Sequence, residues 1–276
     1  MSELLELGFV RDALAASLLI GLMLSLLGIF VVLRRIVFVG AALAQVSAAG
    51  VALAIFAAEA LGIEFLHDHP ESMALAATLA GAALLSVRPR KVNLPSEGVI
   101  GVGYAVASTL AILLIARSPG GEGDSLLLFY GNILAVTPKE LRELLFLCPV
   151  VLAAVSLFYK EFLLVSFNPD SARASGVRVG LWNLLLYALL GLAIAFGIRA
   201  AGALLTFSYL VLPGLAGVLV ARKTWHVPAL AIAIAVVGSV AGILLSVRWD
   251  LPSGPMIVAA LVAELGVLWL VARATA

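Results

Sequence analysis

Long apolar stretches separated by short polar segments run through most of the sequence. A helix needs about 20 apolar residues to cross the ~30 Å hydrocarbon core of a bilayer. On this criterion we predict nine membrane-spanning helices, with eight or ten also possible because residues 179–221 are almost continuously apolar. The predicted spans are residues 9–33, 36–62, 72–88, 95–117, 140–159, 179–199, 200–221, 227–247 and 255–272. The pattern therefore predicts an all-α, polytopic membrane helix bundle that forms one transmembrane domain over residues 1–276.

A further apolar stretch, residues 125–136, is too short to cross a bilayer. Gly131 and Asn132 interrupt it, so we expect a re-entrant or interfacial helix. On such a helix Tyr130 and Asn132 could line the outer mouth of a transport path.

A polar segment, residues 160–178, separates two of the long apolar stretches. Asn168 suits the N-cap of a helix, Pro169 its first position and Asp170 the positive end of its dipole. Gly176 can end the helix in a left-handed conformation. These residues predict a short helix of about two turns at 168–176, which a transporter could offer to a motor subunit. An ordinary well-capped loop would show the same pattern.

Composition agrees with a membrane protein and excludes several other classes. The chain is 63% hydrophobic and 12% charged, with a mean hydropathy of +1.18 and a net charge of +1. No basic field points to nucleic acid. The single cysteine, Cys148, excludes an internal disulfide and a thiolate metal cluster. Because no phosphate-binding G-x-x-x-x-G-K-[ST] loop is present, a pump built on this chain needs another subunit to hydrolyse ATP.

Basic residues predict the orientation, because cytoplasmic loops are enriched in Lys and Arg. One set of loops holds eleven of the 17: Arg34, Arg35, Arg88, Arg90, Lys91, Lys160, Arg173, Arg178, Arg222, Lys223 and Arg273. The other set holds Arg11, Arg117, Lys139, Arg142, Arg199 and Arg248. The segment 160–178 is therefore expected in the cytoplasm, with the N-terminus outside and the C-terminus inside. We expect no cleavable signal peptide, since the start of the chain is acidic.

Four stretches, taken in order, resemble one family. They read LRRIVFVGAALAQVSAAGVALA at 33–54, LLFYGNILAVTPKEL at 127–141, VSFNPDSARASGV with GALLTFSYLVLPGLAGVLVA at 165–177 and 202–221, and DLPSGPMIV at 250–258. This set resembles the permease subunits of ABC importers for zinc, manganese and iron. The resemblance implies a multi-pass protein of a prokaryotic plasma (inner) membrane, with a fold like that of the type II importers for vitamin B12 and siderophores.

The resemblance also implies the partners. Two such chains would form a homodimer in the lipid bilayer, docked to two cytoplasmic ATPase subunits and to an extracytoplasmic substrate-binding protein. This chain would bind no cofactor, because ATP and Mg²⁺ belong to the ATPase subunit. The polar segment would be the coupling helix, with its contact surface formed by Asn168, Pro169, Asp170, Ala172, Arg173, Ala174 and Gly176.

One stretch departs from the family pattern, which usually reads G-D-A-L-S-H-A-S-L-P-G in the second span. Ala41 stands at the Asp position and Gln45 at the His position of that motif. A divalent ion needs carboxylate or imidazole donors to replace its hydration shell, and an amide is a weaker ligand. A path lined by Gln45 and Ser47 would suit a polar neutral solute, a chelate or a loosely held ion.

Other polar residues are candidates for the transport path. Ser208 and Tyr209 precede Pro213, which removes a backbone hydrogen bond and permits a kink that could serve a gate. Glu264 lies near the middle of the last span, where a carboxylate usually faces a bundle interior, a partner or water.

The outer loop GIEFLHDHPES contains His67, Asp68 and His69, which could collect a metal or could be a solvated loop. With Glu264, these three are the weak candidates for metal ligands.

We interpret the chain as the permease of an ATP-driven importer, with divalent metal as cargo and a metal chelate or small polar solute as the alternative. A stand-alone secondary carrier would need ionisable groups along its path, and the spans offer Glu264 and Asp12. A membrane enzyme would need a nucleophile beside a base, and Cys148 has no histidine near it in sequence.

Overall fold

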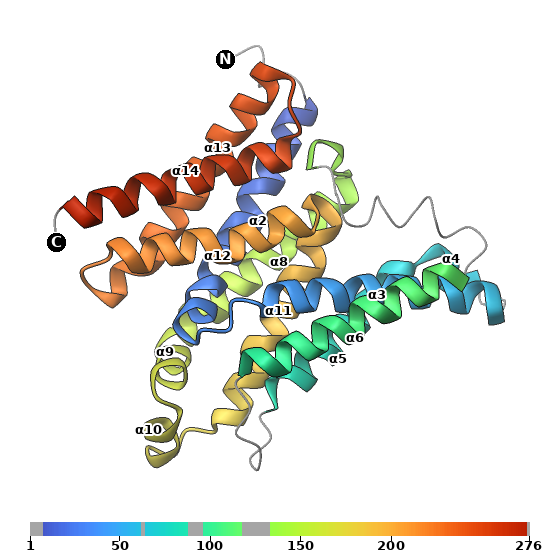
Figure 1. Cartoon of the computed structure of the whole chain (residues 1–276), viewed down its shortest axis with the longest axis horizontal. Helices are drawn as coiled ribbons and strands as arrows, with labels where there is room; N and C mark the ends of the chain where they lie inside the picture. Colours follow the sequence, from blue (N-terminus) through green and yellow to red (C-terminus); the bar gives the residue numbers. More distant parts are fainter. Residues whose placement is uncertain (1–7, 62–63, 88–95, 118–132, 275–276) are drawn as a thin grey trace. The chain divides into compact units, whose positions relative to one another are not determined.

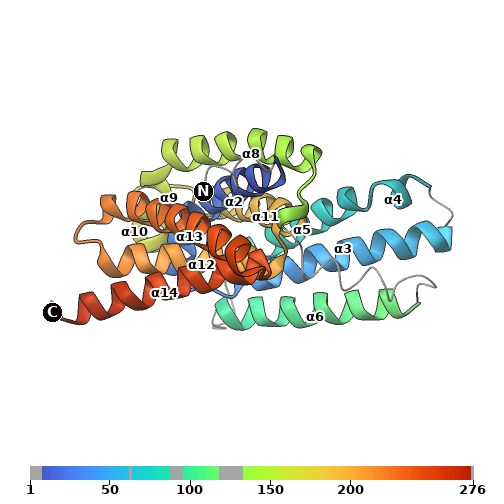
Figure 2. The ribbon, with the colours of Figure 1, turned by 90° about the horizontal axis from the view of Figure 1, so that it is seen from above.

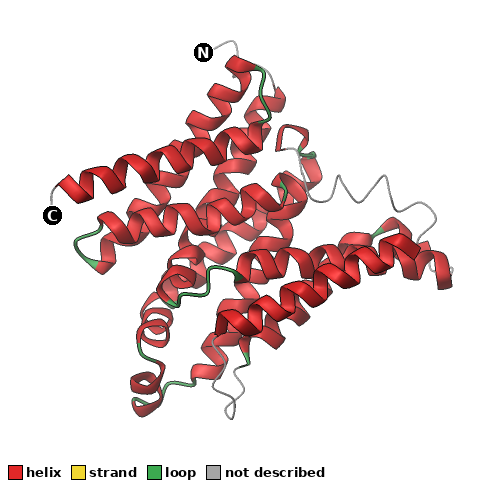
Figure 3. Cartoon of the chain, viewed as in Figure 1, coloured by secondary structure: helices red, strands yellow, loops and turns green. Residues whose placement is uncertain are grey.

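The computed structural model describes residues 8–61, 64–87, 96–117 and 133–274. Over these ranges the chain consists of helices joined by short loops, and no strand is present in them (Figure 3). The all-α class expected from the apolar pattern is confirmed.

The helices follow one another along the chain as labelled in Figure 1. They are α2 (Gly8–Leu33), α3 (Val39–Leu61), α4 (Glu64–Asp68), α5 (Pro70–Ser86), α6 (Ser96–Arg117), η1 (Ile133–Ala135), α8 (Pro138–Leu157), α9 (Tyr159–Phe167), α10 (Pro169–Ala174), α11 (Val179–Ala201), α12 (Ala203–Val220), η2 (Thr224–His226), α13 (Val227–Trp249) and α14 (Ser253–Ala274).

Each of the nine predicted spans falls on a separate helix of this series. In the described residues seven helices are long and apolar enough to cross a membrane alone, and the pair α8 and α9, bent by 65°, raises the number to eight. The ninth, α5, has 17 residues and is about 26 Å long at 1.5 Å per residue. The count of nine is therefore approximate: α5 is shorter than a standard span, and the fifth span is broken.

The described helices belong to two compact units. Unit 1 takes its residues from Met1–Arg34, Tyr130–Tyr159 and Phe196–Ala276, and so contains α2, η1, α8, α12, η2, α13 and α14. Unit 2 takes its residues from Arg35–Phe129 and Lys160–Ala195, and so contains α3 to α6, α9 and α10. Helix α11 begins in unit 2 and ends in unit 1.

In unit 1, α2 packs against α8, α12 and α13. Its most apolar window is 72% buried. A Cβ atom added at Gly28 would stand 1.8 Å from the carbonyl oxygen of Leu210, and one at Gly214 would stand 3.0 Å from the carbonyl carbon of Gly28. The two glycines therefore let the backbones of α2 and α12 touch, which is how membrane helices gain packing contacts without large side chains.

In unit 2, α3 packs lengthwise against both α5 and α6, and α3 and α6 lie side by side in both ribbon views (Figures 1 and 2). Residues 40–54 of the sequence are rich in Gly and Ala, and α3 comes close to α5 at Gly50, where a Cβ would stand 2.7 Å from Cα of Ala74. Gly101 of α6 has more space around it, because a Cβ there would meet nothing within 4 Å.

Candidate functional site

The predicted short helix in the polar segment is present as α10. The side-chain oxygen of Asn168 accepts a hydrogen bond from the backbone N–H of Ser171 at 3.0 Å, and Pro169 occupies the first turn. Asp170 lies in the first turn and Arg173 in the last, joined by an exposed ion pair of 2.7 Å. Opposite charges at these ends suit the helix dipole. The N-terminal capping expected from the sequence is confirmed.

The other end of α10 closes as a Schellman motif. Gly176 has a φ of 80°. Its N–H donates to the carbonyl of Arg173 at 3.0 Å, while the N–H of Val177 donates to the carbonyl of Ala172 at 2.9 Å. This pair of bonds is the signature of a helix that ends at a left-handed residue. The role expected for Gly176 at the helix end is therefore confirmed.

A small apolar cluster holds α10 in place within unit 2. Ala172 is fully buried in it with Val165 and Val179, and Val177 and Trp182 pack against it. Ala172 therefore faces the apolar cluster. The expectation that this residue contributes to a contact surface is corrected, because its side chain is buried. The expected surface residues that remain exposed are Asn168, Asp170, Arg173, Ala174 and Gly176, with Pro169 half-buried.

Sequence reasoning missed that the polar segment holds two helices. Helix α9 precedes α10, and the axis bends by 65° between α8 and α9. Phe162 and Val165 of α9 are buried, and Phe162 meets Trp182 edge to face at 5.6 Å between ring centroids. Their spacing of three residues is the helical signal that could have revealed α9.

The candidates of the second span lie on α3 in unit 2. Ala41 and Gln45 are half-buried and stand four residues apart, so they share a helix face. Ser47 is 5% exposed. It stands two residues from Gln45 and so lies on a different face. Ala41 and Gln45 therefore share one face of α3, and Ser47 lies on another.

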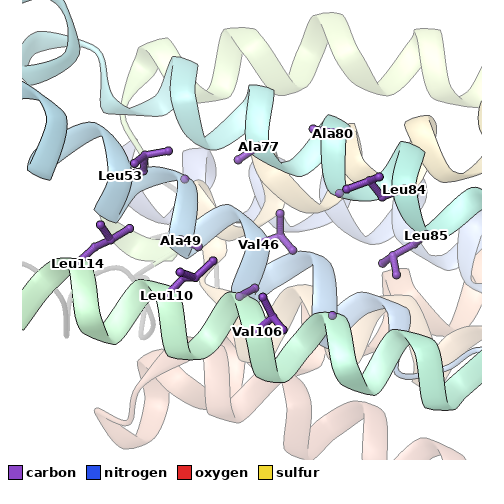
Figure 4. Close-up of a pocket in the computed structure, with 14 residues that line it drawn as sticks. Val46, Ala49, Leu53, Ala77, Ala80, Leu84, Leu85, Val106, Leu110 and Leu114 are labelled. Carbon is purple, nitrogen blue, oxygen red and sulfur yellow. The ribbon is translucent and has the colours of Figure 1, made fainter.

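A groove of about 550 Å³ follows another face of α3, where α5 and α6 complete its walls (Figure 4). Its lining is composed of glycine, alanine, valine and leucine, for example Val46, Leu84 and Leu110. Such a lining provides no oxygen or nitrogen side chain to replace water around a cation. The groove is therefore not a site for a hydrated metal ion.

The candidates of the seventh predicted span lie on α12 in unit 1. Ser208 donates to the carbonyl of Leu204 at 2.8 Å, and α12 continues as a helix past buried Pro213. Tyr209 is fully buried, and its hydroxyl bonds to Ser17 of α2 at 2.6 Å and to Ser239 of α13. The sequence did not single out Ser17 or Ser239, because nothing in either span indicates which hydroxyl faces another.

Two further candidates lie apart. Glu264 is half-buried on α14 in unit 1. Asn132 lies outside the described residues, and of the expected re-entrant stretch 125–136 only 133–136 is described, with η1 at Ile133–Ala135.

In the outer loop, Asp68 ends the short helix α4 and His69 precedes α5. Nδ1 of His69 stands 3.5 Å from Oε1 of Glu71, while the side chain of His67 lies outside the described part. Across the described side chains no group of three His, Cys, Asp or Glu residues is placed to hold a metal ion. Metal collection by this loop remains a prediction.

Comparison with known proteins finds similarity to membrane proteins of metal transport systems. The sequence model described as "ABC 3 transport family" matches residues 6–272. The manganese transport system membrane protein MntC of Halalkalibacterium halodurans is 29% identical over 93% of this chain and 85% of its own length. The chelated iron transport system membrane protein YfeD of Yersinia pestis is 27% identical over 94% of this chain and 84% of its own length.

A solved structure shares the fold. The chain in the structure titled "PsaBC from Streptococcus pneumoniae in complex with Fab" superimposes with a TM-score of 0.80 at 23% identity. The match covers 97% of this chain and 93% of that one. The arrangement of helices described above is thus the arrangement found in that protein.

Proposed function

Because the chain belongs to the ABC 3 transport family, we propose that it is the membrane permease of an ATP-driven importer for divalent metal ions. Manganese and iron are the metals named for its relatives, and zinc is the third candidate. The family match over residues 6–272 is the observation that supports the proposal most directly. The cargo ion is a substrate in transit, and the chain itself catalyses no bond chemistry.

We propose α10 as the coupling helix. It is short, capped at both ends and anchored by Ala172 in a local apolar cluster, while its polar residues are exposed. A rigid, exposed element of this kind can transmit the movement of an ATPase subunit to the neighbouring spans. In the proposed assembly two copies of the chain pair in the bilayer. Two ATPase subunits dock on the cytoplasmic α10 helices, and a substrate-binding protein docks outside.

In the mechanism we propose, ATP binding closes the motor subunits, and their closure moves the two α10 helices. The spans around the central path then tilt, and the path opens alternately to each side of the membrane.

A chelate or a small polar solute is the second candidate cargo. Ala41 and Gln45 share the α3 face on which the family pattern places Asp and His. Neither residue provides a charged ligand, so this face is better suited to a cargo that keeps its own ligands. The relative named for chelated iron supports the same alternative.

The test is uptake by the reconstituted complex. The chain would be purified with its ATPase, inserted in proteoliposomes and supplied with its binding protein, and uptake of Mn²⁺, Fe²⁺ and Zn²⁺ measured with and without ATP. We expect ATP-dependent uptake of at least one metal.

Asp170→Lys is the matched control, because it reverses an exposed charge on α10 and leaves the spans intact. It should abolish uptake while the complex remains folded. Stimulated ATP hydrolysis with no metal uptake would exclude the metal cargo and direct the search to chelates. Uptake without any ATPase subunit would exclude the importer in favour of a stand-alone carrier.

A further inference from the structure

Glu264 occupies an unusual position for a carboxylate. It is the twelfth of the 22 residues of α14, a helix long and apolar enough to cross a membrane. Among the described residues no other carboxylate stands so far from both ends of its helix. At the middle of a span an ionised side chain is costly, and a carboxylate cannot reach the aqueous interface by extending its side chain.

The carboxylate lies at the edge of the packed face of α14. Ile257 and Leu261 of that face are fully buried, and Glu264 follows them by seven and three residues. A Cβ added at Gly238 of α13 would stand 3.6 Å from Oε1 of Glu264 and 2.4 Å from Cδ2 of Leu261. Glycine at 238 thus makes room for Leu261, and the half-buried Glu264 lies next to the same position of α13.

Ser239 follows Gly238 on α13, and its hydroxyl and those of Tyr209 and Ser17 donate their protons to groups other than this carboxylate. Ser239 donates its proton to the carbonyl of Ala235 at 2.6 Å. Tyr209 must then donate to Ser239, and Ser17 must donate to Tyr209, because each hydroxyl has one proton. Each of the three hydroxyl protons is therefore already donated to another oxygen atom. No hydrogen bond or ion pair joins Glu264 to any other residue that the structure describes.

The uncovered side of α14 is extensive, since its most apolar window is only 11% buried within the chain. Lipid can cover the apolar residues of that surface but cannot solvate a carboxylate. Because Glu264 has no hydrogen-bond or ion-pair partner among the described residues, its carboxylate needs water, a proton or a cation. In an importer of divalent cations, the aqueous path provides all three.

We propose that Glu264 is a carboxylate that the divalent cation contacts during transport, and that its edge of α14 faces the translocation path. The inference rests on the proposed function. It gives α14 a charged oxygen ligand of the kind that divalent cations prefer. A single carboxylate holds the ion weakly, and a transport site needs weak binding because the ion must also leave.

The first experiment tests binding without transport. Dicyclohexylcarbodiimide modifies protonated carboxyl groups in apolar surroundings, and mass spectrometry locates the modified residue. The assembled complex in lipid nanodiscs would be labelled with and without Mn²⁺, with K⁺ added to match ionic strength. We expect Glu264 to be modified. Mn²⁺ at ten times its dissociation constant should lower that modification about tenfold. An unmodified Glu264, or modification that Mn²⁺ does not change, would overturn the proposal.

The second experiment measures uptake. Glu264→Gln keeps the shape and removes the charge, so Mn²⁺ uptake should fall about tenfold or more while ATP hydrolysis continues. Glu264→Asp keeps the charge and should restore part of the uptake. Glu97→Gln, an exposed carboxylate at the start of α6, is the matched control and should transport normally.

The two failures are distinguishable. Normal uptake by Glu264→Gln would refute the role of Glu264 and leave the proposed function intact. A wild-type complex that hydrolyses ATP but takes up no metal would refute the metal importer. Protection of Glu264 by Mn²⁺ then still decides whether the carboxylate binds the ion.

Discussion

Single residues decide how closely the helices of each unit approach. A Cβ at Gly28 would overlap the backbone of α12, whereas one at Gly101 would meet nothing within 4 Å. Both glycines lie within long apolar helices, so the sequence around them looks alike. Their difference arises from the neighbour: α2 is largely buried in unit 1, whereas α6 has a window only 17% buried.

We predict that Gly28→Ala destabilises the protein by about 1–3 kcal/mol, because a methyl group forced between two backbones displaces both helices. Gly101→Ala should be neutral or slightly stabilising, since alanine favours a helix by about 0.5–1 kcal/mol over glycine where space allows. Thermal unfolding of the two variants in detergent measures the difference. Equal melting temperatures would contradict the packing described at Gly28.

Residues that act locally could be identified from the sequence, and residues that act across the fold could not. Asn168 and Gly176 affect hydrogen bonds within a few positions of themselves, and both have the expected geometry. Tyr209 was selected as a path candidate, but the hydroxyls that it meets, Ser17 and Ser239, stand 192 and 30 positions away. At such separations, nothing in the sequence around a hydroxyl residue indicates which other hydroxyl it will bond.

At the scale of elements, α10 combines a capped N-terminus, a left-handed C-terminus and one buried alanine in six helical residues. A helix this short is unstable alone, because nucleation costs more than a few hydrogen bonds return. Its caps and its cluster must therefore hold it. A disordered α10 could not transmit the movement of an ATPase subunit. We therefore expect the caps to be required for coupling as well as for the stability of α10.

We predict that Asn168→Ala removes about 1 kcal/mol from the local stability of α10. Amide hydrogen exchange of Ser171 and its neighbours should then become about fivefold faster, since that factor corresponds to about 1 kcal/mol. Ser171→Ala is the control, because it lies on the same turn and is exposed. If exchange is unchanged in Asn168→Ala, the side-chain cap does not stabilise α10.

Element positions were well predicted where apolar length decides them. The predicted span 255–272 lies inside α14, and 227–247 lies inside α13. The broken span was not predicted, because residues 140–159 read as one apolar run while α9 turns away by 65° after Leu157. Phe162 of α9 contacts Trp182, and Val165 lies in one cluster with Ala172. These residues are 7 to 20 positions apart, so the sequence near α9 does not indicate the contacts.

At the scale of the whole molecule, the distribution of basic residues predicts which end faces the cytoplasm. In the orientation that we propose, the loop before α5 is outside and α10 is inside. This proposed orientation would place α10, the proposed coupling helix, on the cytoplasmic side where ATP is available, and the His67–His69 loop on the side from which the proposed cargo would arrive.

We predict opposite labelling of two introduced cysteines. In a Cys148→Ser background, Ser72→Cys should react with a membrane-impermeant maleimide in intact cells, and Ser175→Cys only after lysis. Both serines are exposed, and removing the single native cysteine, Cys148, leaves the introduced thiol as the one thiol of the chain. The reverse labelling pattern would exclude the proposed orientation and the coupling role of α10.

The sequence by itself determined the membrane-spanning helical class, the approximate helix positions, the family and the ends of α10. Each depends on apolar length, on residue order or on interactions between near neighbours in the chain. Only the tertiary structure decided that Ala172 is buried and that the hydroxyls of Ser17, Tyr209 and Ser239 meet. These properties depend on which helix faces which. Because nearly every span is apolar on all sides, hydrophobicity alone does not specify that pairing.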